Sequence, residues 1–122
     1  MAPVPQRIED YAVIGDLHTM ALVGRDGSID WLCLPHFDSS ACFARLLGTE
    51  DNGFWSIAPV GAPESVVAIR RRYRGDSLVL ETEMDTKEGT IRVVDCMPIR
   101  EKWPEVVRIV EAVRGSVRVT TF

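Results

Sequence analysis

Three carboxylates that alternate along one segment, Glu81, Glu83 and Asp85, are the first residues whose types and spacing could perform chemistry. Neighbouring carboxylates can act as general acid and base. Alternate positions of a strand also share one face, where solvated acidic residues are commonly found. Arginines with the same spacing precede them: Arg70, Arg72 and Arg74. We therefore favour cross-strand ion pairs on a wet strand face over catalysis.

A second candidate site lies between Trp31 and Asp38, where Trp31, Phe37 and Asp38 could contact a sugar. Aromatic rings stack on sugar rings, and a carboxylate accepts hydrogen bonds from hydroxyl groups. For His36, Phe37 and Asp38 a binding role and a structural role both stay open. Asp38 precedes Ser40 by two residues, where it would assist a helix cap.

Trp31 has a stronger structural interpretation than its neighbours. It alternates with Ile29 and Cys33 in an expected strand, so it should share their face. We expect that face to be buried, which favours a core position for Trp31.

The remaining reactive residues match no known catalytic or metal-binding pattern. There is no serine–histidine–aspartate order, no glycine-rich phosphate loop and no redox cysteine pair. Cys33, Cys42 and Cys96 lack the spacing of metal ligands, and we expect them to be reduced core residues. His18 and His36 could add nitrogen ligands, but scattered single residues rarely form a zinc site. The sequence predicts no catalytic residue and no metal site, and it leaves the cofactor open.

Length and composition indicate one modest globular domain covering residues 1–122. The net charge of -4 argues against a nucleic-acid partner, which requires clustered positive charge. No apolar stretch approaches the roughly 20 residues that span a bilayer. Residues 1–10 lack the basic end and apolar run of a secretory signal, so we expect a cytoplasmic protein without membrane contact.

The residue pattern predicts an all-β fold, an antiparallel β-sandwich with one short helix. Residues 20–23 and 29–34 should form a hairpin around Asp26-Gly27, since Asp-Gly favours a tight turn. Ser39 and Ser40 should cap a helix of about two turns that ends at Gly48. Apolar alternation predicts further strands within residues 54–57, 66–73, 77–85, 90–97, 106–114 and 117–122. We expect Gly115-Ser116 to join the last two strands as a pair.

Residues 117–122 alternate without a turn or cap signal, so we expect the chain to be the first part of a longer protein. An unpaired strand edge at Phe122 would also permit self-association, so a homo-oligomer is a further expectation.

Much of the chain resembles the amino-terminal domain of glycoside hydrolase family fifteen, the bacterial and archaeal trehalases and glucoamylases. The match is densest around Asp26-Gly27-Ser28-Ile29-Asp30-Trp31-Leu32-Cys33-Leu34-Pro35. Other matching pieces are Ile8-Glu9-Asp10-Tyr11, Ile14-Gly15-Asp16, Ala21-Leu22-Val23, Phe37-Asp38-Ser39, Arg72-Tyr73, Leu78-Val79-Leu80-Glu81-Thr82 and Val94-Asp95-Cys96-Met97-Pro98. The resemblance thus extends over nearly the whole chain.

This resemblance implies a β-sandwich followed by an (α/α)6 barrel that hydrolyses α-glucosidic bonds with inversion. One glutamic acid would protonate the leaving oxygen and another would activate water. Both belong to the barrel, so the fragment alone is expected to be inactive. Residues Trp31 to Asp38 would reach toward the barrel and its small carbohydrate substrate, because pockets often form between domains.

The chain departs from the family pattern at His36, where arginine is common, and near Ser40, where a bulky residue or proline is usual. Histidine lacks the permanent charge and forked donors of arginine. Trehalose is the expected substrate, with a glucoamylase-type α-glucosidase as an alternative. A free-standing carbohydrate-binding module, with Trp55, Tyr73 and Trp103 in a flat row, and an assembly domain are the remaining alternatives.

Overall fold

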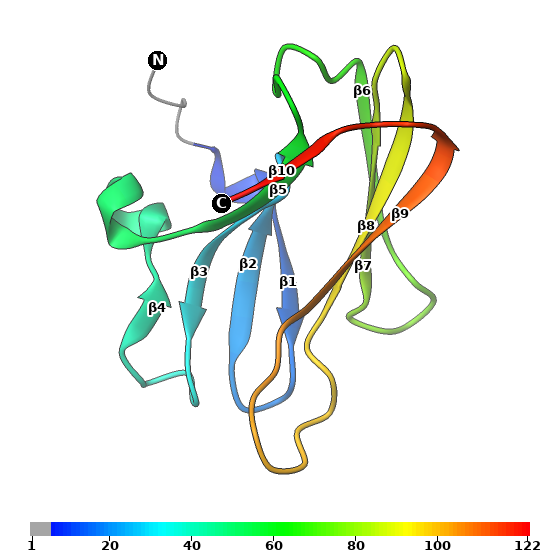
Figure 1. Ribbon diagram of the computed structural model, residues 1–122. Coiled ribbons are helices and arrows are strands. Elements are labelled where there is room, and N and C mark those ends of the chain that lie inside the picture. The colour runs from blue at the N-terminus through cyan, green and yellow to red at the C-terminus, as the bar shows by residue number, and fades with distance from the viewer. Residues whose placement is uncertain (1–5) are drawn as a thin grey trace.

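The computed structural model describes residues 6–122 and consists of two antiparallel sheets packed face to face (Figure 1). One sheet has the order β1-β2-β3-β5-β10, with β4 paired to β3. Its strands are β1 (Tyr11–Gly15), β2 (Met20–Gly24), β3 (Ser28–Cys33), β4 (Ala41–Phe43), β5 (Trp55–Pro59) and β10 (Val119–Thr121). The other has the order β6-β7-β8-β9, with β6 (Ala68–Tyr73), β7 (Leu80–Asp85), β8 (Gly89–Cys96) and β9 (Val107–Gly115). The predicted all-β sandwich is confirmed.

Apolar side chains between the two sheets form the core. One cluster joins Ile14, Val23, Ile29 and Leu32 of the first sheet to Leu80 of the second. A second cluster places Ile57 of β5 against residues of β7 and β8: Met84, Ile91 and Val93. Alternate strand residues point to opposite faces, so these apolar residues fill the space between the sheets.

The hairpin predicted around Asp26-Gly27 is confirmed as β2 and β3. Gly27 has φ +85°, a conformation that favours glycine, and Asp26 Oδ1 accepts a hydrogen bond from Ser28 N at 3.0 Å. The pairing Leu22↔Trp31 followed by Val23↔Ile29 leaves Asp30 as an extra residue on β3. Asp30 is therefore a β-bulge.

The helix expected between Ser39 and Gly48 is not formed. Residues Ala41–Phe43 pair with β3 as strand β4, and only Arg45–Leu47 adopts a helical conformation, a single 3-10 turn. Two further 3-10 turns span Ile8–Asp10 and Glu50–Asn52. Pairing to the open side of β3 satisfies backbone groups that an isolated two-turn helix would leave at its ends.

The last strand also differs from the expectation. β10 does not pair with β9 but crosses to the other sheet, where Thr120 pairs with Ala58 of β5 (Figure 1). The pairing continues to the last residue, since Phe122 and Ser56 exchange two backbone hydrogen bonds of 3.0 Å. The connection from β9 thus links the two sheets instead of closing a hairpin.

Candidate functional site

In the segments that resemble the glycoside hydrolase family, most polar residues stabilise the fold. Asp30 is buried at the bulge, where it accepts hydrogen bonds from Ser28 Oγ at 2.6 Å and Tyr11 Oη at 2.5 Å. Arg45 Nε donates to the same carboxylate at 2.9 Å. Burial, together with the hydrogen bond to Asp30, raises the pKa of Tyr11. This network joins β1, β3 and the 3-10 turn at Arg45–Leu47, so the Asp30 carboxylate has a structural role.

Asp16 has a comparable role in the loop between β1 and β2. Its Oδ1 accepts hydrogen bonds from the backbone N–H groups of His18 at 2.9 Å and Thr19 at 3.0 Å. Its Oδ2 lies 2.9 Å from Nε of Arg100 in the loop between β8 and β9. Burial opposes ionisation of Asp16, but these hydrogen bonds and the guanidinium of Arg100 lower its pKa overall. Asp16 therefore fixes two loops at the same end of the sandwich.

The structure leaves His36, Phe37 and Asp38 exposed in the loop that follows β3. Phe37 is 58% exposed, and its backbone N–H donates to His18 O at 3.1 Å. The rings of His18 and His36 meet edge to face with centroids 6.1 Å apart. The loops after β1, β3 and β8 lie together at the lower end in Figure 1, which we call the loop end. The structure thus brings three of the four sequence-predicted residues to the loop end.

Trp31 is separated from the other three, and its expected core position is wrong. The bulge at Asp30 shifts the alternation, so Trp31 lies opposite Leu22 while Leu32 lies opposite the buried Ala21. Trp31 therefore shares the outward face of Leu22, where it is half-buried. Among the predicted site residues, Trp31 is the one placed on a sheet face and not in a loop.

Asp38 does not assist a helix cap, because no helix starts at Ser40. Ser39 Oγ instead accepts a hydrogen bond from His36 N at 3.1 Å, and Ser39 N donates to His36 O at 3.1 Å. These short-range bonds shape the turn that presents Phe37 and Asp38 to solvent.

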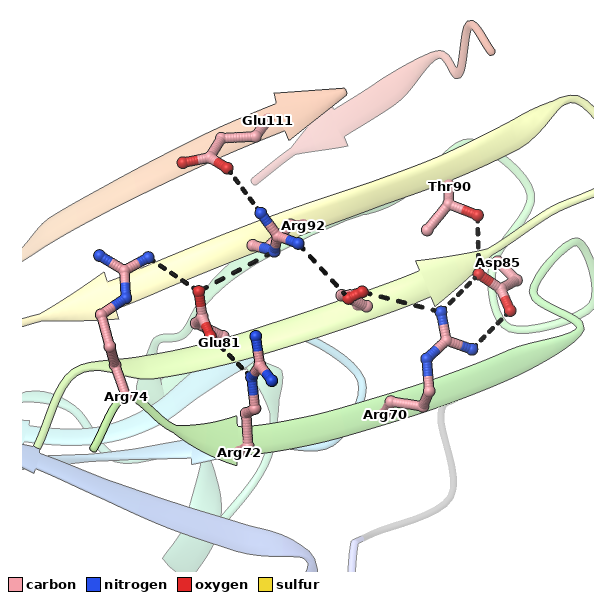
Figure 2. Close-up of polar contacts among 9 residues, drawn as sticks. Arg70, Arg72, Arg74, Glu81, Asp85, Thr90, Arg92 and Glu111 are labelled. Atoms are coloured by element: carbon pink, nitrogen blue, oxygen red, sulfur yellow. Dashed lines mark hydrogen bonds and ion pairs between the residues drawn. The ribbon is translucent and has the colours of Figure 1, made fainter. Parts of the chain in front are cut away.

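The alternating carboxylates on β7 take part in ion pairs with the arginines (Figure 2). Glu81 receives hydrogen bonds from Arg74 at 2.7 Å and Arg72 at 2.9 Å. Asp85 receives two from Arg70, at 2.6 and 2.9 Å. The predicted cross-strand pairs are confirmed, but the face is less wet than expected because the arginines cover Glu81, which is buried.

The acid–base properties of this layer also argue against catalysis. The hydrogen bonds from Arg74 and then Arg72 lower the pKa of Glu81, and the hydrogen bond from Arg70 lowers that of Asp85. A general acid needs a raised pKa so that it holds a proton near neutral pH. These carboxylates therefore stabilise the outer face of the sheet.

We expect Glu81→Gln to flatten the acid side of the stability profile. Since the folded pKa of Glu81 is lowered, its contribution is complete above the ordinary value of 4.5 and is lost as pH falls through the folded value. The free energy of unfolding, measured by urea titration from pH 7 to pH 2, should fall less steeply in the variant. Glu88→Gln in the turn after β7 is the control and should follow the wild type. Parallel wild-type and Glu81→Gln profiles would contradict a lowered pKa of Glu81 in the folded domain.

The aromatic residues considered for a flat binding row lie in three separate places. Trp55 belongs to β5 and donates from its indole to Thr121 Oγ1 at 3.1 Å, with Arg108 over its ring. Tyr73 ends β6 and bonds through its hydroxyl to both backbone groups of Val13. Trp103 lies in the β8–β9 loop. These positions form no common platform.

The cysteines do not form a reactive cluster. Cys33 is buried, Cys96 is partly buried and Cys42 is exposed on β4, so the expectation of three core cysteines is wrong for Cys42. Residues 6–122 contain no group of three or more histidine, cysteine or acidic residues arranged to hold a metal ion. Within the same residues, no helix has the length and apolarity needed to cross a membrane.

Sequence reasoning missed two exposed apolar residues of the loop end, Leu17 and Ile99, and considered Trp103 there only as part of a flat aromatic row. Leu17, in the β1–β2 loop, is 89% exposed and has φ +76°, the one non-glycine residue in the described part of the chain with a positive φ. Ile99 and Trp103 are exposed in the β8–β9 loop. A signal was available, since Leu17 is the one apolar residue of Asp16-Leu17-His18-Thr19, a polar stretch typical of a turn.

Together these features define a β-sandwich domain with a structural polar framework and an exposed loop end. A family model described as trehalase-like, N-terminal, matches residues 2–121. The chain belongs to this family of trehalase-like N-terminal domains.

Curated relatives that the chain matches are trehalases. The chain is 35% identical over 120 residues to a trehalase of Thermoplasma volcanium, covering 93% of the chain and 19% of that protein. It is 35% identical over 101 residues to a trehalase of Mycobacterium tuberculosis, covering 83% and 14%. Trehalase 1 of Sulfolobus acidocaldarius is 42% identical over 90 residues, covering 73% and 15%. The chain thus spans less than a fifth of these relatives' length, and no solved structure matches it significantly.

Proposed function

We propose that the chain is the N-terminal accessory domain of a trehalase, which hydrolyses α,α-trehalose to glucose. The family match and the trehalase relatives support this assignment. The catalytic (α/α)6 barrel would be the later part of the same polypeptide, and the sandwich would support the barrel and its substrate pocket. A glucoamylase-type α-glucosidase is the alternative activity.

The single observation that supports an accessory role most strongly is the division of the family-resembling stretch into two groups. Asp16, Asp26, Ser28 and Asp30 have partners inside the sandwich. His36, Phe37 and Asp38 are exposed at the loop end. Exposed aromatic and charged residues on an ordered loop are typical of binding surfaces.

His36, Phe37 and Asp38 would contact the barrel or its small carbohydrate substrate, with Trp31 on the adjoining sheet face. His36 offers a hydrogen-bond donor and an acceptor, Asp38 accepts from hydroxyl groups, and Phe37 offers an apolar ring. The acids that cleave the glycosidic bond would come from the barrel, so we expect the 122-residue chain alone to be inactive.

Glucose release from trehalose and from maltose tests this proposal. The chain and the complete gene product that contains it are assayed side by side. Activity on trehalose in the complete protein alone is expected. Preference for maltose would favour the glucoamylase alternative, and activity in the chain itself would overturn the accessory role.

We expect Phe37→Ala and Asp38→Ala to lower trehalose hydrolysis by the complete protein without lowering its melting temperature. Both side chains are exposed, so their removal should change the free energy of unfolding by no more than about 0.5 kcal/mol. Activity and thermal unfolding are measured on the same preparations. A large loss of stability with no specific loss of activity would instead assign both residues to the fold.

Self-association is a second candidate role because, within residues 6–122, β10 next to Phe122 and β9 are the last strands of their sheets and each has an unpaired edge. The sheet order ends at β9, and its Ile109 and Val110 are exposed. Long apolar edges can pair with a second strand. Light scattering over a range of protein concentrations would test the oligomeric state.

We further propose a cytoplasmic setting, which the three free cysteines support.

A further inference from the structure

The β8–β9 loop is attached to the rest of the loop end by an ion pair, although it contains no helix or strand. Nε of Arg100 lies 2.9 Å from Asp16 Oδ2, and a second guanidinium nitrogen lies 2.8 Å from the same oxygen. Asp16 has a buried side chain and Arg100 is nearly buried, so water screens this pair weakly. The ion pair joins the β8–β9 loop to the β1–β2 loop, which in turn bonds to the β3–β4 loop through Phe37 N and His18 O.

Large apolar side chains project from these connected loops into solvent. Ile99 is 87% exposed and Trp103 is 67% exposed, in addition to Leu17 and Phe37. Next to Trp103 the loop forms a shallow hollow lined by Pro98, Ile99, Glu101, Lys102, Trp103 and Glu105. The sandwich core does not need these side chains, because they lie outside both core clusters. Exposed apolar groups gathered at one end of a domain indicate an interaction surface.

Leu17 adds a second, independent sign of an interaction surface. A β-carbon disfavours positive φ, so a leucine at φ +76° is a costly choice at a position where glycine or asparagine would fit. The Asp16 carboxylate holds this conformation by accepting hydrogen bonds from two backbone N–H groups, those of His18 and Thr19. The strained backbone thus presents an apolar side chain outward in a fixed direction, as an anchor residue requires.

The charges around the apolar side chains favour a protein partner over a membrane. Asp38, Glu101 and Glu105 are exposed around them, and Lys102 is the neighbouring base, with its Nζ 5.5 Å from the centre of the Trp103 ring. An acidic rim is repelled by anionic lipid headgroups. It fits a partner with an apolar centre and basic groups around it.

We propose that Leu17, Ile99 and Trp103 form a docking surface for the catalytic part of the longer protein, with Arg100 and Asp16 as positioning residues. This inference rests on the proposed function. More than four-fifths of each trehalase relative lies outside the match, which supplies a partner on the same polypeptide. The surface continues the exposed segment that contains His36, Phe37 and Asp38, so one contact would cover both.

The test uses the complete gene product and the double substitution Leu17→Asn and Trp103→Ala. Asparagine tolerates positive φ, so the folded sandwich should be retained. In the wild type, docking should make the sandwich unfold together with the catalytic part in calorimetry. In the variant we expect the sandwich to unfold separately, at the temperature of the 122-residue chain, and trehalose hydrolysis to fall at least tenfold.

Val67→Ser is the matched control, because Val67 is 70% exposed directly before β6, away from the loop end. The control should keep coupled unfolding and full activity. The 122-residue chain carrying the double substitution should melt within about 4 °C of its parent, which separates docking from folding.

The remaining outcomes distinguish failure of the docking surface from failure of the proposed function. If the complete protein hydrolyses trehalose and the double variant behaves as the wild type, the docking surface is wrong and the proposed function stands. If the complete protein hydrolyses no trehalose, the proposed function fails, whereas coupled unfolding still reports on docking. Sedimentation of the chain with phosphatidylserine vesicles that depends on Trp103 would overturn the inference in favour of a membrane.

Discussion

Replacing Arg108 with methionine is expected to destabilise the domain by about 3–5 kcal/mol. The Arg108 side chain is 0% exposed and its Nε lies 2.7 Å from Asp95 Oδ1, while Asp95 is 1% exposed. The other guanidinium nitrogens donate to the carbonyl groups of Trp55 at 2.8 Å and Gly27 at 2.6 Å. Methionine fills similar space but leaves a buried carboxylate and two carbonyl oxygens without these donors.

The pKa of Asp95 predicts how the loss of stability in Arg108→Met will depend on pH. Burial raises the pKa of Asp95, and the hydrogen bond from Arg108 opposes that rise. Without Arg108 the carboxyl group should take up a proton at higher pH. The loss of stability in Arg108→Met should therefore be greatest at neutral pH and smaller in acid, which urea unfolding at several pH values would show.

Arg70→Met is the matched control for Arg108→Met. Arg70 also makes two short bonds to a carboxylate, that of Asp85, but its side chain is 54% exposed. Solvent screens such pairs, so the expected loss of stability is much smaller than that of Arg108→Met. Equal losses in the two variants would show that burial does not decide the strength of these pairs.

Local patterns in the sequence predicted the hairpin of β2 and β3 but gave no information on the bulge. Asp26-Gly27 fixes a turn because glycine alone accepts its positive φ without strain, so β2 and β3 follow directly. At the bulge, the Asp30 carboxylate accepts a hydrogen bond from Arg45, which lies fifteen residues away. Strict alternation cannot include such a partner, and it therefore placed Trp31 on the wrong face.

The two errors in secondary structure share a physical cause. Residues 39–48 have apolar spacing that suits a helix, and residues 117–122 follow a turn signal that suits a hairpin. In each case a distant strand, β3 or β5, offered backbone pairing that outweighed the local preference. Local propensities amount to tenths of a kcal/mol per residue, so tertiary pairing commonly overrides them.

The candidate site was predicted in part for a related reason. His36, Phe37 and Asp38 could be singled out because they lie in one short segment with mixed chemistry. Leu17, Ile99 and Trp103 come from segments more than eighty residues apart, and the Asp16–Arg100 pair brings those segments together. An exposed apolar residue cannot be distinguished from a core residue until the fold shows which face is covered.

Gly27→Ala is the second substitution with a large expected effect, a loss of about 2–5 kcal/mol. A left-handed conformation costs an alanine roughly 1–2 kcal/mol, and overpacking a tight site adds about 1–3 kcal/mol. A β-carbon at Gly27 would lie 2.3 Å from the carbonyl oxygen of Ile57, in the backbone of β5. Strand backbone cannot move aside as a flexible side chain can, so the contact between β3 and β5 should loosen.

Gly75→Ala separates backbone strain from this steric clash. Gly75 also has a positive φ, +58°, but a β-carbon there would meet nothing within 4 Å. Its expected cost is the conformational part alone, about 1–2 kcal/mol. The difference between the two variants in urea unfolding then measures how closely the β2–β3 turn packs on β5. A cost for Gly27→Ala no greater than that of Gly75→Ala would mean that β5 can yield, and that the Asp26-Gly27 turn does not anchor it.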